Sequence, residues 1–174
     1  VARRGMRLAV ELGLPLMTVI DTPGAALSPD AEQGGLAGEI ARSLANLSTL
    51  DAPSLCLLLG EGNGGGALAL LPADKILAAQ HAWLSPLPPE GASAIVHRDI
   101  DHADEMARSQ HVRSSDLQAI GLVDQIIPEL PDAADEPEDF CLRVGRVVAH
   151  ELAVLATTPL ETLRARRSLR INNL

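Results

Sequence analysis

The pattern of apolar and polar positions switches several times between a helical and a strand-like spacing. Residues 2–12 place apolar side chains on one helical face, and Gly13 follows as a typical helix stop. Residues 15–20 form a short run rich in β-favouring side chains. Residues 53–59 are almost continuously apolar, which predicts a strand that is buried on both faces.

The rest of the chain continues this alternation of helices with single strands. Helices are predicted over residues 31–50, from 68 to 71, after 88, over 101–109, from 114 to 117, and over 138–156 and 159–169; strands are predicted over 74–79, 82–85 and 122–127. The alternation is typical of an α/β fold with crossover connections and a parallel or mixed sheet. An acidic, turn-rich stretch at 131–137 predicts a boundary between residues 1–130 and a helical tail over 131–174.

A glycine-rich segment, Gly60–Ala67, lies between the buried strand and a helix. Glycines at such a junction let a ligand approach the backbone closely, and the start of a helix has N–H groups without helical partners. The arrangement suits an oxyanion hole made by the backbone N–H groups of Gly65, Gly66 and Ala67. A phosphate-binding loop is disfavoured because its usual glycine motifs and lysine are missing. A simple glycine-rich turn is the remaining interpretation.

Two further junctions between elements carry candidate chemistry. Asp21–Ala25 follows the first predicted strand, at the end where open α/β sheets place ligands. We expect Asp21 to bind its own backbone, as aspartate before a turn commonly does. Pro89–Ala92 is a second strand-to-helix junction that could present amides. Glu90 in this junction is interpreted as a partner of the helix dipole, in preference to a general acid or base.

Composition and charge exclude several classes of protein. The chain is 47% hydrophobic and 21% charged, so it can bury a core, and its net charge of −9 makes nucleic acid and membrane poor partners. The sequence has neither an apolar run long enough for a membrane span nor a recognisable secretory leader, which favours a cytoplasmic location. The basic segment from Arg164 to Arg170 is interpreted as a solvated or subunit-facing helix. We expect Cys56 and Cys141 to be free buried thiols, and no metal-ligand spacing involves the cysteines or histidines.

Several of these segments form an ordered set. The blocks are Asp21–Ala25, then Gly60–Ala69, then Trp83–Ser85 with Pro89–Ile95 and Arg98–Asp99, then Asp116–Glu129. In this order they resemble the α-type half of the carboxyltransferase component of bacterial biotin-dependent acetyl-CoA carboxylase. The resemblance covers roughly residues 1–130 and is nearest in character to actinobacterial enzymes that fuse the β- and α-type halves in one chain.

The resemblance implies a crotonase-like fold, a spiral of β-β-α turns, of which this chain would hold an incomplete part. It implies transfer of a carboxyl group from carboxybiotin, carried by a separate biotin carboxyl carrier protein, to an acyl-CoA. The usual acyl-CoA is acetyl-CoA, and the product is then malonyl-CoA for fatty acid synthesis. Negative charge develops on the thioester oxygen and on the biotin ureido oxygen, and both oxygens need preorganised N–H donors. No metal is implied in this chain.

The resemblance also assigns roles to particular positions. Gly65, Gly66 and Ala67 would form the oxyanion hole that faces the biotin ureido oxygen. The implied substrate- and biotin-binding positions are Gly24, Gly64, Gly91 and Ala92. This chain departs from the family pattern at Asn63–Gly64, where Gly-Ser is common, at Leu84 and Leu87, where aromatic residues are common, and at Ala92, where cysteine is frequent. These departures bear on the shape of the pocket and on the length of the substrate.

The implied partners are a β-type half, in the same polypeptide or as a separate subunit, together with biotin carboxylase and the carrier protein. The family forms hexamers when its halves are fused and heterotetramers when they are separate. Because its active site lies between an α-type half and a β-type half, we expect this chain to be a portion of a longer polypeptide and inactive alone. Two alternatives remain: another crotonase-type acyl-CoA enzyme, such as a hydratase or thioester hydrolase that uses Glu90, and a non-catalytic assembly subunit.

Overall fold

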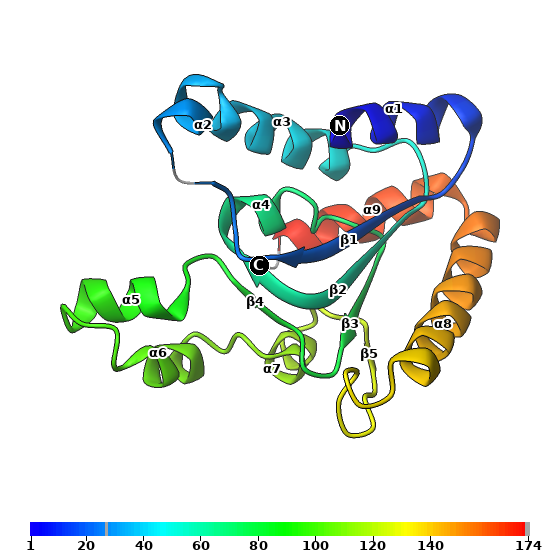
Figure 1. Ribbon diagram of the computed structural model, residues 1–174. Coiled ribbons are helices and arrows are strands. Elements are labelled where there is room, and N and C mark those ends of the chain that lie inside the picture. Colours follow the sequence, from blue (N-terminus) through cyan, green and yellow to red (C-terminus); the bar gives the residue numbers. More distant parts are fainter. Residues whose placement is uncertain (27, 173–174) are drawn as a thin grey trace.

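A parallel sheet forms the centre of the computed structural model, which describes residues 1–26 and 28–172, the last two without their side chains (Figure 1). Its main strands run in the order β1-β2-β3-β5, and β4 pairs with the far end of β2. The strand bounds are β1 Leu16–Thr22, β2 Ser54–Asn63, β3 Lys75–Ala79, β4 Trp83–Ser85 and β5 Gln125–Ile127. Every pairing between these strands is parallel, which agrees with the crossover connections predicted from the alternation of elements.

Strand β2 joins the two parts of the sheet. Its first half, through Leu58, is buried and pairs with β1 on one side and β3 on the other. This confirms the prediction of a strand buried on both faces. The strand continues further than predicted, because Gly60–Gly62 are still extended and its last three residues pair with β4. The pairing with β1 shifts register between Ile20 and Thr22. The glycine-rich segment therefore begins as strand.

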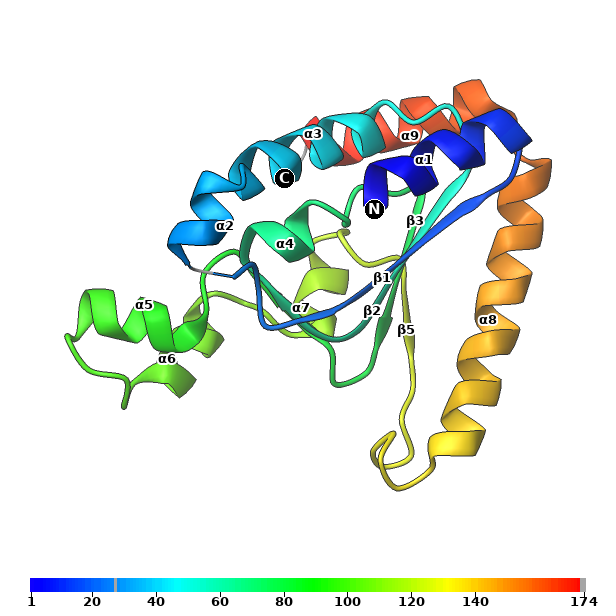
Figure 2. The same ribbon diagram turned by 45° about the horizontal axis from the view of Figure 1, so that its top comes forward.

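Helices cover the sheet on two sides (Figure 2). One layer contains α1 (Ala2–Leu12), α3 (Leu36–Ser48), α4 (Gly64–Leu68) and α9 (Leu160–Asn172). Helix α8 (Pro137–Thr157) lies along the sheet, away from this layer. The remaining helices are α2 (Pro29–Gln33), α5 (Pro89–Val96), α6 (Ala103–Ser109) and α7 (Ser114–Ala119), and α5 with α6 projects from the body as an arm. Among the described helices, none combines the length and apolar sequence that a membrane-spanning segment requires.

The helix predicted over residues 31–50 is wrong in one respect, because two helices occupy this segment. Helical structure is interrupted between α2 and α3 at Gly34 and Gly35, and Gly35 has a φ of 75°, a left-handed conformation that favours glycine. Ser28 begins α2 by accepting a hydrogen bond from the N–H of Ala31 at 3.1 Å. The two helices thus start from separate caps, and periodicity alone cannot separate them.

The helices after residue 130 contribute to the central core. Phe140 and Leu155 of α8 and Leu163 of α9 belong to the same buried cluster as Leu55 and Leu77 of the sheet. The division of the chain at residue 130 stays a prediction. The packing shows that α8 and α9 cover the sheet directly.

The basic segment at the end of the chain docks onto the body. Three arginines spaced three residues apart on α9 pair with aspartates of earlier elements, as Arg164 with Asp51, Arg167 with Asp74 at 2.7 Å, and Arg170 with Asp124 at 2.6 Å. Residues three apart share a helix face, and along it Arg167 is buried and Arg170 is largely covered, whereas the Arg164 side chain is still 49% exposed. The interpretation as a solvated or subunit-facing basic helix is therefore wrong for Arg167 and Arg170, whereas Arg164 and Arg166 remain exposed.

The two cysteines lie in different environments, so the expectation that both are buried is wrong for one of them. Cys56 of β2 is fully buried, and burial raises the pKa of its thiol to about 12. Cys141, in the first turns of α8, is exposed. The reactive thiolate is thus suppressed at Cys56, whereas the side chain of Cys141 is accessible to solvent.

We therefore expect one thiol per native chain to react rapidly with a chromogenic disulfide reagent near neutral pH. The second thiol should react only after denaturant unfolds the chain. Cys141→Ala should remove the fast phase, and Cys56→Ala should leave it unchanged. Two fast thiols in the native wild-type chain would contradict the buried position of Cys56.

Candidate functional site

The candidate site lies where β1 and β2 end. The loop after β1 is fixed by side chains of its own and by the neighbouring strand. Thr22 Oγ1 accepts a hydrogen bond from the N–H of Gly24 at 3.2 Å, and Gly24 has a φ of 115°. Asp21 Oδ1 accepts a hydrogen bond from the N–H of Glu61 at 3.1 Å. The prediction that Asp21 binds its own backbone is wrong in its partner, because the carboxylate holds a strand 40 residues further along the chain.

The glycine-rich segment turns from strand to helix at Asn63 and Gly64. Gly64 has a φ of 60°, which a side chain would strain, and α4 begins there. Gly65 and Gly66 are half-buried, whereas Ala67 is fully buried. N–H groups in the first turn of a helix have no intrahelical partner. The two glycines therefore offer the more accessible amides of the predicted trio.

Two backbones meet closely at this point. A Cβ built on Gly66 would lie 3.4 Å from the backbone nitrogen of Ala25, and one on Gly24 would lie 3.5 Å from the carbonyl oxygen of Asn63. A Cβ on Gly65 would lie 3.3 Å from Ile40 of α3. The loop after β1 and the start of α4 are thus adjacent, although the sequence predicted them as separate features. Their small residues let the two backbones approach.

The residue before the helix does not cap it. Asn63 has the extended backbone of an N-cap residue, and its side chain is only 3% exposed, yet it makes no side-chain cap hydrogen bond. Its Nδ2 instead donates to Glu61 Oε1 at 2.9 Å. Within the part of the chain that the structure describes, Asn63 Oδ1 is buried and has no hydrogen-bond partner. Sequence reasoning missed this pair, although two polar residues at i and i+2 of a strand share one face.

The second predicted junction has a different construction. The N–H of Ala92 donates to the carbonyl of Pro88 at 2.9 Å, so this amide is occupied within its own helix. A Cβ built on Gly91 would contact Leu87 at 3.4 Å. The N–H of Ala92 is therefore not a free donor, and the place of Gly91 and Ala92 among the substrate- and biotin-binding positions stays a prediction. The connection before α5 does approach the glycine cluster, because a Cβ on Gly64 would lie 3.9 Å from the carbonyl oxygen of Pro86.

Polar side chains of the α5–α6 arm are engaged in its internal structure. Ser93 Oγ donates to the carbonyl of Asp99 at 2.7 Å and accepts from the N–H of His102 at 3.2 Å. His102 Nδ1 lies 2.8 Å from Asp99 Oδ1; this hydrogen bond raises the pKa of His102 and lowers that of Asp99. Glu90 is exposed in the first turn of α5. The serine holds the arm together, which argues against its use as a nucleophile.

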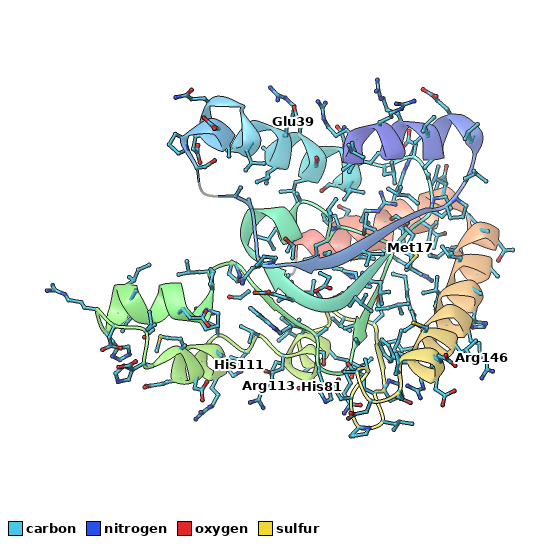
Figure 3. All side chains as sticks on the ribbon, viewed as in Figure 1. Met17, Glu39, His81, His111, Arg113 and Arg146 are labelled. Atoms are coloured by element: carbon cyan, nitrogen blue, oxygen red, sulfur yellow. The ribbon has the colours of Figure 1, made fainter. Side chains whose placement is uncertain are left out.

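One group of possible metal ligands lies outside the candidate site. His81, labelled in Figure 3, lies with Glu129 and Asp132, and a ligand atom from each falls within 4.8 Å of the others. Glu129 is buried and already accepts hydrogen bonds from the N–H groups of His81 at 3.0 Å and Ala133 at 2.9 Å. His81 lies 48 residues before Glu129, so spacing could not reveal the group. Its observed bonds fix the turn before β4 to the segment after β5.

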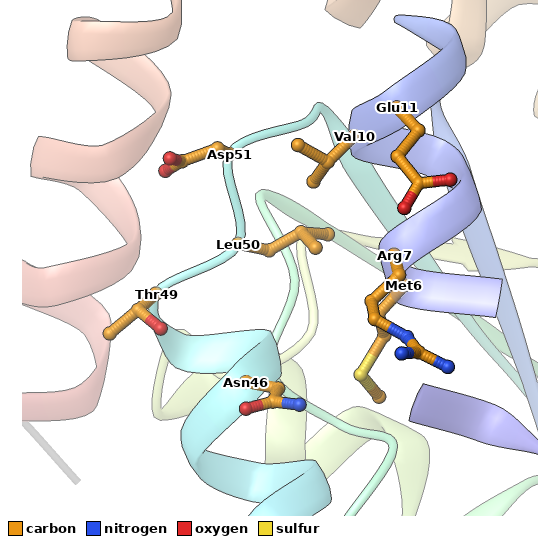
Figure 4. Close-up of a pocket in the computed structure, with 8 residues that line it drawn as sticks. All are labelled: Met6, Arg7, Val10, Glu11, Asn46, Thr49, Leu50 and Asp51. Atoms are coloured by element: carbon orange, nitrogen blue, oxygen red, sulfur yellow. The ribbon is translucent and has the colours of Figure 1, made fainter. Parts of the chain in front are cut away.

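A hollow of about 330 Å³ also lies away from the glycine cluster (Figure 4). It is lined by α1 residues and by the segment from the end of α3 to Asp51: Met6, Arg7, Val10, Glu11, Asn46, Thr49, Leu50 and Asp51. None of the predicted site residues lines it. The hollow is open and shallow between two helices, and it plays no part in the candidate site.

Comparison with known proteins gives a consistent family. The family model described as acetyl co-enzyme A carboxylase carboxyltransferase-like matches residues 1–174. A probable biotin-dependent acyl-coenzyme A carboxylase beta3 subunit of Mycobacterium tuberculosis is 61% identical over 158 residues, covering 91% of this chain and 32% of the relative. The acetyl-coenzyme A carboxylase carboxyl transferase subunits beta/alpha of Salinispora arenicola are 42% identical over 168 residues, covering 95% of this chain and 30% of the relative.

Solved structures support the fold. Transcarboxylase 12S, solved as a hexamer with methylmalonyl-coenzyme A bound, aligns with a TM-score of 0.71 at 24% identity and covers 91% of this chain and 31% of its own. A Pseudomonas malonate decarboxylase hetero-dimer aligns with a TM-score of 0.70 at 19% identity, and the alignment covers 98% of this chain and 72% of the matched chain. These similarities agree with the crotonase-like α/β fold expected from the sequence.

The chain spans about a third of the length of the first of these curated relatives. The family match nevertheless extends over every residue of the chain, including the helices after residue 130, which the sequence resemblance left out. This chain belongs to the acetyl-CoA carboxylase carboxyltransferase-like family, the carboxyltransferases of biotin-dependent acyl-CoA carboxylases.

Proposed function

We propose that this chain is the α-type half of a carboxyltransferase that moves a carboxyl group from carboxybiotin to acetyl-CoA, giving malonyl-CoA. The single observation that carries the proposal is the uncapped, half-buried start of α4 at Gly65 and Gly66. Its N–H groups lie in a first helical turn, where they have no helical partner and a partial positive charge. An oxygen that gains negative charge is the group such donors stabilise best.

The local geometry fits a flat, polar ligand such as the biotin ureido group. Glycine at positions 64, 65 and 66 leaves the backbone free of side chains where a ligand would approach. Biotin, when bound, supplies the carboxyl group and the nitrogen that holds it. The N–H groups of Gly65 and Gly66 would bind the ureido oxygen, with Ala67 as the third predicted donor. The loop at Gly24 would form the adjacent wall, since it lies against Asn63 and Gly66.

Backbone donors account for the catalytic role without a side-chain acid or base. Removing one preorganised donor of this kind costs about 100- to 1000-fold in kcat in enzymes where it has been tested. The hydroxyl groups of Ser85 and Ser93 are bonded within the chain, at 2.8 Å to Gln110 Oε1 and 2.7 Å to the carbonyl of Asp99. These bonds argue against a serine nucleophile, and Glu90 is left as the candidate acid for the alternative, a hydratase or thioester hydrolase.

The proposed partners would supply the parts of the active site that this chain lacks in the proposal. A donor set for the thioester oxygen, and a site for coenzyme A, would come from a β-type half, and biotin carboxylase with the carrier protein would supply carboxybiotin. Hexamer and heterotetramer both remain as proposed assemblies. Apolar side chains exposed on the α5–α6 arm, Ile95, Val96 and Ile100, offer a surface for such a partner.

The test is biocytin-dependent decarboxylation of malonyl-CoA, the reverse reaction, by the protein made from its complete reading frame. We expect activity there, with its partner subunits, and none from residues 1–174 alone. Methylmalonyl-CoA and longer carboxylated acyl-CoAs run in parallel decide the chain length of the acyl group. Turnover by residues 1–174 alone would contradict the half-site, and folded complete protein that is inactive with every acyl-CoA would favour the assembly role.

A further inference from the structure

The side chain of Asn63 is held in one of two orientations open to it. Asparagine is among the strongest N-cap residues, and it caps by accepting the N–H of the second or third helical residue with its Oδ1. In α4 those residues are Gly65 and Gly66. The backbone of Asn63, with φ −114° and ψ 137°, already has the extended N-cap conformation. The backbone at Asn63 would therefore need no change for its side chain to cap α4.

Glu61 opposes that rotation. Asn63 Nδ2 donates to Glu61 Oε1 at 2.9 Å, and a carboxylate oxygen accepts hydrogen bonds, so the amide nitrogen must face Glu61. The Oδ1 atom is then turned to a buried position where no described group donates to it. A buried acceptor without a donor is unfavourable. The bond to Glu61 is the interaction that holds this orientation against the alternative.

Glu61 itself is firmly placed by the sheet. Its N–H donates to Asp21 Oδ1 at 3.1 Å, and it pairs in register with Trp83 of β4. The backbone of Glu61 is thus fixed by strands on both sides of β2, three residues before the first residue of α4. A group positioned in this way can orient a neighbouring side chain without contacting the ligand.

We propose that Glu61 is a positioning residue that holds Asn63 away from the first turn of α4. The N–H groups of Gly65 and Gly66 then stay free for an oxygen of the substrate. When the bond to Glu61 is lost, Asn63 Oδ1 becomes the cap of its own helix and competes with substrate for these donors. The inference rests on the proposed function of the two amides, and it assigns Glu61 a role separate from theirs.

Four forms of the complete protein test this: wild type, Glu61→Ala, Glu61→Gln and Glu61→Ala/Asn63→Gly. A typical N-cap preference corresponds to a population ratio of about 5- to 30-fold, so Glu61→Ala should lose kcat by about that factor. The KM for acyl-CoA should change little. Glu61→Gln should keep most of the activity because its amide oxygen still accepts from Asn63. The double variant should regain most of it because no cap remains.

Hydrogen–deuterium exchange of the segment 63–68 gives a second readout that needs no turnover. Exchange at the first turn should be slower in Glu61→Ala than in wild type, and should return to the wild-type rate in the double variant. Unchanged exchange and activity in Glu61→Ala would overturn the inference, as would a double variant as slow in turnover as Glu61→Ala. If the wild-type protein lacks carboxyl transfer, the proposed function fails, while the exchange rates still decide the orientation of Asn63.

Discussion

Replacing Arg167 with alanine is expected to lower the free energy of unfolding by about 3–5 kcal/mol, the typical cost of removing one partner of a buried ion pair. The guanidinium is 1% exposed and uses all its N–H groups. It donates to both oxygens of Asp74, at 2.9 and 2.7 Å, and to the carbonyls of Leu47, Leu50 and Ala52 at 2.9–3.3 Å. One side chain thus ties α9 to the sheet and to the end of α3.

The cost arises mainly from what the arginine leaves behind. Asp74 is buried, and without Arg167 its remaining partners are the N–H and hydroxyl of Ser54, at 2.8 and 2.9 Å. The carboxylate would be left in a poorly solvated place without its cationic partner, which is unfavourable. The three carbonyl groups would lose their donors at the same time.

Urea unfolding of residues 1–174, followed by circular dichroism, measures the loss. Arg166→Ala is the matched control, since Arg166 is the exposed neighbour on the same helix and should change stability by no more than about 0.5 kcal/mol. Asp74→Asn/Arg167→Met should lose less than Arg167→Ala because it removes both charges together. Equal effects of Arg167→Ala and Arg166→Ala would show that the buried pair adds no net stability.

Local signals in the sequence predicted most of the elements. Gly13 ends α1 with a φ of 63°, as a glycine helix stop should. The apolar run that starts at residue 53 became the buried central strand. These features depend on residues a few positions apart, so the sequence contains them directly. The break at Gly34 and Gly35 was missed because the apolar period continues across it.

The role of the basic helix could not be predicted, because its partners are distant in the sequence. Arg164, Arg167 and Arg170 bind aspartates that lie 113, 93 and 46 residues away. A cluster of arginines on a helix is more often solvated. Only the folded structure shows that an aspartate lies beside each of these three arginines. Ion pairs between remote segments leave no local pattern.

The candidate site was predicted in part. Order and composition marked the loop at Gly24 and the segment at Gly65 and Gly66 as separate features, and the structure brings them into backbone contact. The interactions of the polar side chains that shape the site were missed: Asp21 was predicted with the wrong partner, and Glu61 was not singled out. Asp21 and Glu61 act on backbone and side-chain groups of the neighbouring segments, and these interactions depend on how β1 and β2 end together.

Replacing Gly66 with proline is expected to lower the kcat of carboxyl transfer by about 100- to 1000-fold, the usual effect of losing one oxyanion donor. Proline has no N–H, and position 66 lies in the first turn of α4, where that N–H makes no intrahelical bond. The helix therefore keeps its own hydrogen bonds while the site loses a donor. The proline ring would also meet the loop at Ala25, whose nitrogen lies 3.4 Å from a Cβ at position 66.

Gly66→Ala is the matched control for this second effect. Alanine adds the same Cβ against Ala25 and keeps the N–H, so it separates loss of the donor from crowding of the loop. We expect Gly66→Ala to retain activity within a few-fold of wild type, and both variants to unfold at a similar urea concentration. Equal losses in the two variants would assign the effect to crowding, whereas unchanged kcat in Gly66→Pro would remove this amide from the chemistry. A loss confined to proline leaves the backbone N–H of Gly66 as the group that stabilises the reacting oxygen.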